Sequence, residues 1–350
     1  MYRPLRADVR GVIALSNKEF EKIEEINLRQ EKNLLVFSQI AAYLNNAPCT
    51  VTREIIEGIT GGNKAYEDYA YASFMSDFLC DDESLANELF KDYYIKSVKR
   101  LEADKYVENP YYKNIKIPNK QIGKWTLGYQ SYEPYEAFIR DDIIVDGYKE
   151  IPCVGYFDSR FEFPTVFENG VEWMAIKPNE IETMKKPIED AYGNVLVYGL
   201  GLGYYPYMIS LKSNVNQITV VERDESVISL FNEYVLPQFE KKEKIKIVKS
   251  DAFEYAEKEM GKHSYDFVFT DLWHDVSDGV ELYVKMKKHE SKLHGAEFAY
   301  WIEPSLLSAV RVRIFEALYE GIKAKKIEKT PEEINKILDY SYLKQFVKKL

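Results

Sequence analysis

The chain has 350 residues, of which 46% are hydrophobic and 30% are charged. This mix is typical of a globular protein with a full apolar core, and it excludes a disordered chain, a collagen-like chain and a small disulfide scaffold. At roughly 100–200 residues per domain, the length predicts two or three domains. The formal net charge of −10 argues against nucleic acid as a partner, because nucleic-acid binders normally carry a basic face.

The cysteines, the N-terminus and the hydropathy pattern bear on localisation. Three widely spaced cysteines indicate neither a disulfide framework nor a zinc knuckle. Residues 1–11 contain no apolar signal core, and the longest mostly apolar stretch, Leu34 to Leu44, is too short to span a bilayer. The four histidines fit no zinc signature. We therefore expect a cytoplasmic protein with no metal site and no membrane partner.

The first third of the chain is predicted to be helical, because apolar residues recur at spacings of three and four. The predicted helices are 17–44, 52–59, 67–79 and 83–101. Proline and asparagine break the pattern in 108–123, which predicts a linker. Short β-like runs follow at 125–129, 137–139, 143–145, 154–157 and 166–175. The pairs Asp146-Gly147 and Asn169-Gly170 are hairpin signals between such runs.

From residue 194 onward, strands and helices are predicted to alternate. The strands are 194–198, 217–221, 244–248, 265–270 and 297–302. Such alternation predicts an α/β fold, a Rossmann-like doubly wound parallel sheet with helices on both faces. The predicted domains are a helical N-terminal domain (1–107), a linker and β region (108–185), the Rossmann-like domain (186–322) and a helical C-terminal tail (323–350).

Glycines and acids follow the first four predicted strands of this sheet. In strand order they are Gly199-Leu200-Gly201-Leu202-Gly203, then Glu222, then Asp251-Ala252, then Asp271. Ligands of parallel α/β sheets bind at the carboxyl ends of the strands, so these residues predict a nucleotide site. The dinucleotide fingerprint G-x-G-x-x-G is not met, because Tyr204 stands where its third glycine is required.

Residues 194–319 instead resemble the class I S-adenosylmethionine-dependent methyltransferases, and within them the spermidine-synthase group. VVERDESVISLFNEYVLPQF (220–239) is similar to a V-E-x-D-x-x-V segment of that group that ends in L-P. KIKIVKSDAFEYAEK (244–258) and YDFVFTDLWHD (265–275) are similar to its G-D-A and Y-D-x-I-x-x-D segments. Upstream, ENGVEWMAIKPNEIETM (168–184) resembles the hairpin D-G-x-x-Q-x-x-x-x-D-E.

The resemblance implies a role for each strand-end residue. The turn residues Gly199, Leu200, Gly201 and Gly203 would lie against the methionine part of S-adenosylmethionine. Glu222 would bind the ribose hydroxyls. Asp251 would accept from the adenine amino group, with Ala252 beside the ring. Asp271 would face the reacting centre, where a carboxylate can take or orient a proton.

Two further residues of the loop after the fourth strand are candidates for catalysis. His274 lies near Asp271 and could act as a base, and Asp275 is the second acid of the loop. In the resembled group that second acid comes one position earlier. That group also places a tyrosine and a histidine after the D-E of its hairpin, and neither is present in Asn179–Met184.

These departures indicate a changed acceptor and leave three functions open. The first, which we prefer on the sequence alone, is methyl transfer from S-adenosylmethionine to a small or peptidic acceptor. The second is aminopropyl transfer from decarboxylated S-adenosylmethionine. The third is a non-catalytic cofactor-binding scaffold. The resemblance also implies a homodimer.

Overall fold

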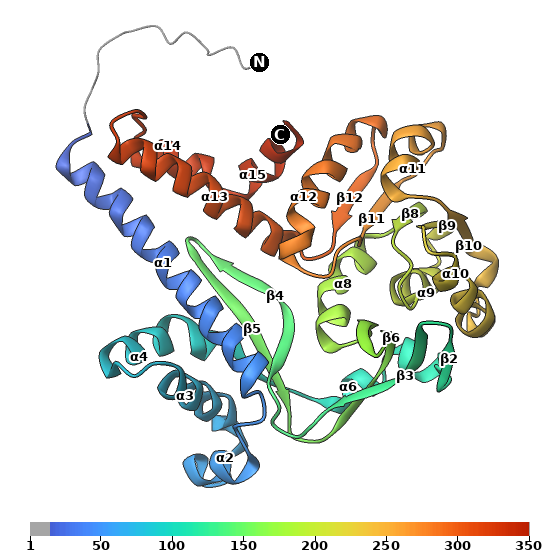
Figure 1. Cartoon of the computed structure of the whole chain (residues 1–350), viewed down its shortest axis with the longest axis horizontal. Helices are drawn as coiled ribbons and strands as arrows, with labels where there is room; N and C mark the ends of the chain where they lie inside the picture. Colours follow the sequence, from blue (N-terminus) through green and yellow to red (C-terminus); the bar gives the residue numbers. More distant parts are fainter. Residues whose placement is uncertain (1–14, 350) are drawn as a thin grey trace, which may run out of the picture.

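The computed structural model describes residues 15–349 (Figure 1). The prediction about a signal sequence concerns residues 1–11, which lie outside the described residues. Within 15–349, no helix combines the length and the apolar character that a membrane span requires.

A five-stranded parallel sheet forms the C-terminal half of the fold. Its strands are β8 (Gly193–Tyr198), β9 (Val215–Glu222), β10 (Ile245–Lys249), β11 (Phe267–Thr270) and β12 (Glu297–Tyr300). They are arranged in the order β10-β9-β8-β11-β12, and every neighbouring pair is parallel. The predicted α/β, Rossmann-like class is confirmed.

This strand order creates a switch point at the centre of the sheet. The chain leaves β8 toward β9 and β10 on one side, then returns to β11 and β12 on the other. A crevice opens where the connections diverge, at the carboxyl ends of β8 and β11. The connecting helices are α9 (Tyr204–Ser210), α10 (Glu225–Leu230), α11 (Ala252–Lys258), α12 (Val276–Lys287) and α13 (Glu303–Lys323).

Two smaller sheets precede this one. The antiparallel sheet has the order β2-β3-β6-β7, with β2 (Lys120–Ile122), β3 (Trp125–Tyr132), β6 (Phe161–Glu168) and β7 (Val171–Ala175). Asn169 and Gly170 turn the chain between β6 and β7 at positive φ, as predicted. Helix α8 (Pro178–Asp190) then leads from β7 into β8.

The third sheet corrects two predictions. It has the order β1-β5-β4, with β1 (Val98–Leu101), β4 (Phe138–Asp146) and β5 (Lys149–Phe157). The predicted helix 83–101 was wrong at its end, because Val98–Leu101 is drawn into parallel pairing with β5. The two short strands predicted at 137–139 and 143–145 are the single strand β4, whose pairing with β5 is irregular near Asp141.

The N-terminal helices are largely as predicted. They are α1 (Asn17–Asn46), α2 (Arg53–Thr60), α3 (Glu67–Leu79) and α4 (Glu83–Leu89), followed by the short α5 (Ile95–Ser97). A capping box of Ser16 and Glu19 starts α1. The predicted linker 108–123 contains the short helix α7 (Pro110–Asn114), preceded by α6 (Ala103–Val107). Asn109 caps α7 and Pro110 takes its first position, which proline tolerates well.

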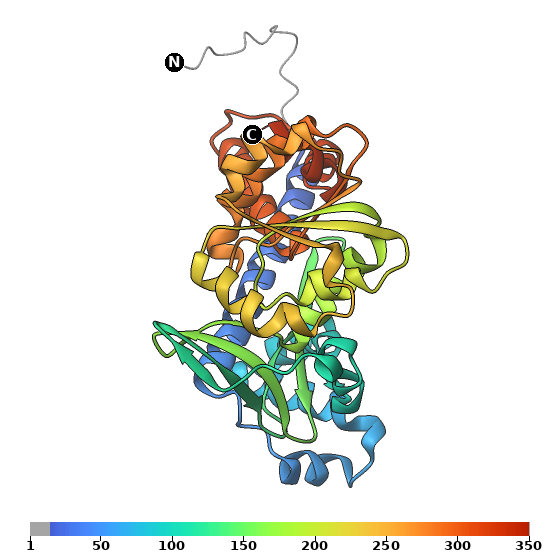
Figure 2. The ribbon, with the colours of Figure 1, turned by 90° about the vertical axis from the view of Figure 1, so that its right-hand side faces the viewer.

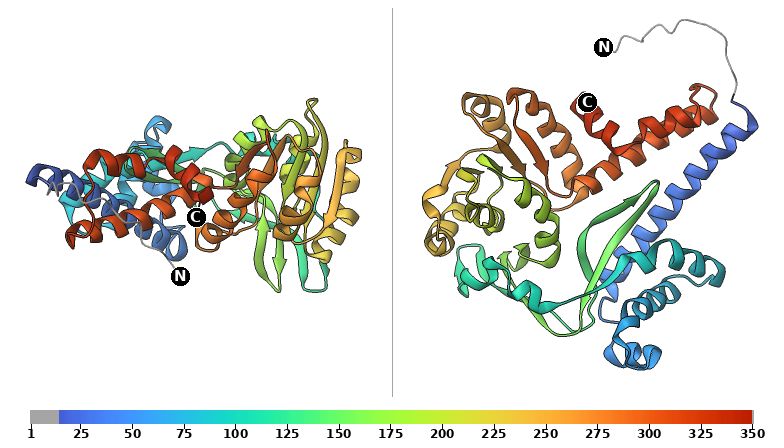
Figure 3. Two further views of the ribbon diagram at one scale, coloured as in Figure 1. Left: turned by 90° about the horizontal axis from the view of Figure 1, so that it is seen from above. Right: turned by 180° about the vertical axis from the view of Figure 1, so that it is seen from behind.

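The C-terminal helices pack back onto the start of the chain. Helices α14 (Pro331–Ile337) and α15 (Tyr340–Phe346) follow α13, in agreement with the predicted helical tail. Ile23 and Ile26 of α1 form one buried cluster with Phe315 of α13 and Ile334 of α14. The long helix α1 also lies along β5, and both arrangements can be followed in Figures 2 and 3. The division into four domains stays a prediction.

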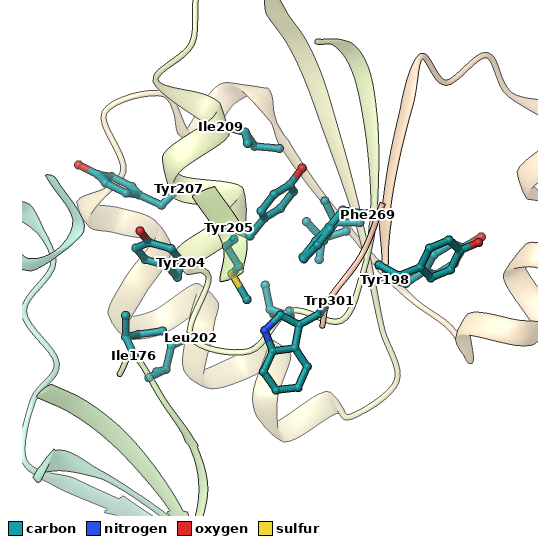
Figure 4. Packing of buried hydrophobic residues seen from close by; sticks show 14 of the residues in the cluster. Ile176, Tyr198, Leu202, Tyr204, Tyr205, Tyr207, Ile209, Phe269 and Trp301 are labelled. Atoms are coloured by element: carbon teal, nitrogen blue, oxygen red, sulfur yellow. The ribbon is translucent and has the colours of Figure 1, made fainter. Parts of the chain in front are cut away.

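Aromatic side chains fill the core beneath the parallel sheet's carboxyl edge (Figure 4). Tyr205 of α9 stacks on Phe269 of β11 with ring centroids 4.0 Å apart. Trp301, just after β12, belongs to the same buried cluster. Its indole N–H donates to Thr183 Oγ1 of α8 over 2.9 Å. The edge of the sheet and helix α8 are thereby fixed to one another.

Candidate active site

A cleft of about 550 Å³ lies at the carboxyl edge of the parallel sheet. That volume is in the range of small-molecule and cofactor sites. Its walls come from β7, from the start of α8, and from the loops after β8, β9, β10 and β11. Eight of the residues predicted from the sequence line it: Gly199, Leu200, Gly201, Glu222, Asp251, Ala252, Asp271 and His274.

The glycine turn brings the backbone of two strand ends into contact. Gly199 has φ +96°, and a Cβ built on it would lie 2.0 Å from the carbonyl oxygen of Asp271. A side chain at this position is therefore excluded on steric grounds. Gly201 has φ +54°, and a Cβ built on it would lie 3.6 Å from the sulfur of Met174. The turn thus leaves its own backbone exposed along the cleft wall.

Glu222 is held at the end of β9 by three backbone donors. Its Oε1 accepts from the N–H groups of Arg223 and Asp224, each at 2.8 Å, and its Oε2 accepts from Leu200 at 3.2 Å. These bonds orient the carboxylate toward the glycine turn. A carboxylate has about four acceptor positions, so Glu222 retains one, on Oε2, for a ribose hydroxyl.

Asp251 caps helix α11 and also lines the cleft. Its Oδ1 accepts from the backbone N–H groups of Phe253 and Glu254, at 2.9 and 3.0 Å. Both of these bonds end on the same oxygen, so Oδ2 is the atom that would accept from an adenine amino group. Ala252 and Phe253 lie beside it in the cleft wall.

Two predicted site residues, Gly203 and Asp275, lie outside the cleft lining. Gly203 starts α9 with φ +76°, and a Cβ built on it would lie 2.3 Å from the ring of Phe231. It therefore allows close packing against that ring, away from the cleft lining. Asp275 caps α12 and accepts from the backbone and hydroxyl of Ser277 through Oδ1. Neither residue lines the cleft, and we assign no catalytic role to Asp275.

A pair of carboxyl groups, Glu180 and Asp271, was not predicted from the sequence. Glu180 stands in the first turn of α8, and Asp271 follows β11. Burial raises the pKa of Asp271 to about 7. Burial, together with the nearby charge of Asp271, raises the pKa of Glu180 well above its usual range. The signal for Glu180 was present in the Asn179-Glu180 dipeptide, which stands at the D-E of the resembled hairpin.

His274 lies at the rim of the cleft beside Trp173 and Asp278. The rings of Trp173 and His274 meet edge to face with centroids 5.0 Å apart. The Nδ1 atom of His274 lies 3.1 Å from Oδ2 of Asp278. The partner of His274 is therefore Asp278, one helical turn further along the chain.

The cleft lining is strongly acidic. Its acids are Glu172, Glu180, Glu222, Asp251, Asp271 and Asp278, and its bases are Lys177 and Arg223. Lys177 is already paired with Glu172. An excess of carboxylates in a partly desolvated cleft favours a cationic ligand. The residues therefore fit a sulfonium nucleoside: a glycine turn, a ribose acceptor, an adenine acceptor and an acidic wall.

Comparison with known proteins gives one family and a set of solved structures. Residues 181–292 match the family described as the spermine/spermidine synthase domain. A spermidine synthase from Thermotoga maritima matches with 15% identity and a TM-score of 0.29, covering 40% of this chain and 53% of that one. A spermidine synthase in complex with the transition state analogue AdoDATO matches with 14% identity and a TM-score of 0.31.

The second match covers 44% of this chain and 59% of that one, so the chain spans about half the length of the spermidine synthases it matches. No curated protein matches the chain. Residues 181–292, which run from α8 to just beyond α12, are thus similar to the spermine/spermidine synthase domain, which confirms the resemblance to the spermidine-synthase group noted at the strand ends.

Proposed function

We propose that the chain is a transferase that binds a nucleoside of the S-adenosylmethionine type and passes an alkyl group from it to an amine. The observation that carries this proposal is the Glu180–Asp271 pair, two carboxyl groups with raised pKa in one acidic cleft. Uncompensated carboxylates at such a depth are costly unless a cation joins them. A cationic acceptor would supply that charge.

The adenosine half of the cofactor would be held by residues of the strand ends. Glu222 would accept from the ribose hydroxyls and Asp251 from the adenine amino group. The backbone of Gly199 to Gly201 would lie against the chain that bears the sulfur. When bound, the cofactor supplies an electrophilic carbon next to a positively charged sulfur.

Asp271 and Glu180 would bind and orient the acceptor. Their negative charges attract an ammonium group and hold its nitrogen at a fixed place in the cleft. Orientation of this kind lowers the entropic cost of bringing the two reactants together. Trp173 and Trp301 form apolar walls of the same cleft and exclude water from part of it.

The charge of the lining supports the decarboxylated cofactor, and hence aminopropyl transfer, over methyl transfer. The lining contains six acidic and two basic residues, and one of the basic residues, Lys177, is paired with Glu172. A cofactor that keeps its methionine carboxylate would add a further negative charge to this wall. Methyl transfer uses the same adenosine contacts and is the alternative that experiment separates.

Thermal unfolding of the purified chain tests the cofactor. The ligands are S-adenosylmethionine, its decarboxylated form, S-adenosylhomocysteine and NADH. A ligand at 100 times its Kd adds about 2.7 kcal/mol to the stability of the folded state. We expect the largest rise in Tm with the decarboxylated form. A rise only with S-adenosylmethionine would favour methyl transfer, and no rise with any ligand would favour a scaffold.

We expect Glu222→Gln to weaken cofactor binding by roughly tenfold or more, because a hydrogen bond to a charged group contributes about 1.5–3 kcal/mol. Isothermal titration with the ligand that stabilises the wild type measures the change. The control is Glu254→Gln, an exposed position on α11 outside the cleft lining. Equal affinities of wild type and Glu222→Gln would remove Glu222 from the site.

A further inference from the structure

The imidazole of His274 is held in one orientation at the rim of the cleft. Trp173 packs against one side with an interplanar angle of 83°. Asp278 lies at 3.1 Å from its Nδ1 atom. The His274 side chain is 58% exposed, so that it contacts both the cleft and bulk water. A ring that is held by two neighbours and still reaches solvent is well placed to move protons.

Asp278 also fixes which ring nitrogen carries the proton. The backbone N–H groups of His274 and Asp275 donate to its Oδ1, each at 3.1 Å. Burial raises the pKa of Asp278, but these backbone bonds and the His274 ring outweigh it, so the net pKa is below the usual aspartate value. An ionised carboxylate only accepts hydrogen bonds. The neutral ring therefore carries its hydrogen on Nδ1, and Nε2 keeps a lone pair.

We propose that Nε2 of His274 takes the proton that the acceptor loses during transfer, and that Asp278 is its positioning residue; this rests on the amine transfer proposed above. The acceptor ammonium gives one N–H proton to Nε2. The freed lone pair on nitrogen forms the new N–C bond as the C–S bond breaks, and the electrons of that bond go to sulfur. The imidazolium then releases its proton to water.

The Glu180–Asp271 pair is less suited to this step. The two carboxylates attract an ammonium only while they are ionised, and a proton on Asp271 would weaken that attraction. The unprotonated Nε2 of the His274 ring can accept this proton, and the adjacent Asp278 would stabilise the imidazolium that forms, as in other histidine–carboxylate pairs. The remaining charged pair near Trp173 joins Glu172 and Lys177, which cancel one another.

His274→Gln and Asp278→Asn test the assignment on the full chain. His274→Gln should reduce kcat by roughly 10²-fold and change the acid limb of the kcat–pH profile, which would then reflect the Glu180–Asp271 pair alone, with Tm shifts by cofactor unchanged. Asp278→Asn should also reduce kcat strongly although His274 is present, because the amide of Asn can donate to Nδ1 and move the ring proton to Nε2. Nitrogen NMR of His274 reads the tautomer directly in the wild type and in Asp278→Asn.

Matched controls separate a catalytic effect from a structural one. His263→Gln replaces an exposed histidine outside the cleft, and Asp82→Asn replaces the aspartate that caps α4. Both should keep the wild-type profile. The inference would be overturned by a wild type with the ring proton on Nε2, or by a His274→Gln variant with the kcat and the kcat–pH profile of the wild type. Cofactor binding and turnover would then still support the proposed function. A wild type that neither binds nor turns over any cofactor would overturn both.

Discussion

Asp271→Asn is expected to reduce turnover by roughly 10²–10³-fold, because it removes the charge that orients the acceptor at the reacting centre. The same change should leave cofactor affinity nearly intact, since the proposed adenosine contacts are those of Glu222 and Asp251. Steady-state kinetics and thermal shift with cofactor measure the two effects. Asp190→Asn, at the exposed end of α8, is the control and should retain full turnover.

In the absence of ligand, the Asp271→Asn variant should be more stable than the wild type, although its turnover is lower. Burial raises the pKa of Asp271 to about 7, whereas an unfolded aspartate titrates near pH 4. Between these values the folded protein binds more protons than the unfolded chain, so wild-type stability falls as pH rises. The Asn variant lacks this loss. Its Tm should equal that of the wild type below about pH 4, exceed it increasingly between about pH 4 and 7, and keep the full difference above pH 7.

A wild-type Tm that did not fall relative to the variant across this interval would contradict a strained carboxyl pair at the site. Saturating amounts of the decarboxylated cofactor and an amine should reduce the Tm difference between the variant and the wild type. The reason is that a bound cation favours the ionised forms of Glu180 and Asp271. The comparison therefore links the electrostatics of the empty cleft to the charge of its ligand.

Arg311→Met is expected to lower the free energy of unfolding by about 3–5 kcal/mol, the usual cost of leaving a buried charge without its partner. Arg311 on α13 forms an ion pair with Glu150 on β5, and the side chains are 2% and 1% exposed. The guanidinium also donates to the Gly147 carbonyl at 3.0 Å and lies over the ring of Tyr340. One residue thereby joins the β4–β5 hairpin to α13 and α15.

Thermal and urea unfolding of the variants measure this contribution. Arg313→Met, two residues along the same helix and exposed, is the control and should change stability little. In the double variant Arg311→Met/Glu150→Gln, no buried charge is left unpaired, and the amide oxygen of the new Gln can still accept from one of the two hydroxyls, Tyr340 or Ser308, that donate to Glu150. It should recover more than half of the loss. A single variant as stable as the wild type would show that the pair contributes nothing.

The sequence was most informative where a single short segment contains both a strand and the candidate functional residues that follow it. The five strands of the parallel sheet are runs of apolar residues, and the residues after each run follow directly in the chain. Because parallel strands end at one edge, Gly199, Glu222, Asp251 and Asp271 could be placed in one cleft without knowledge of the packing. Their roles toward a cofactor stay predictions.

Only the tertiary structure decided which groups meet across elements distant in sequence. Glu180 comes to Asp271 because α8 packs against the end of the sheet, and no periodicity in the chain encodes that contact. The sequence pattern of Val98–Leu101 predicts the end of a helix, but in the structure this segment is a strand that pairs in parallel with β5. Local pattern fixes elements and their ends, whereas side-chain partners depend on long-range packing.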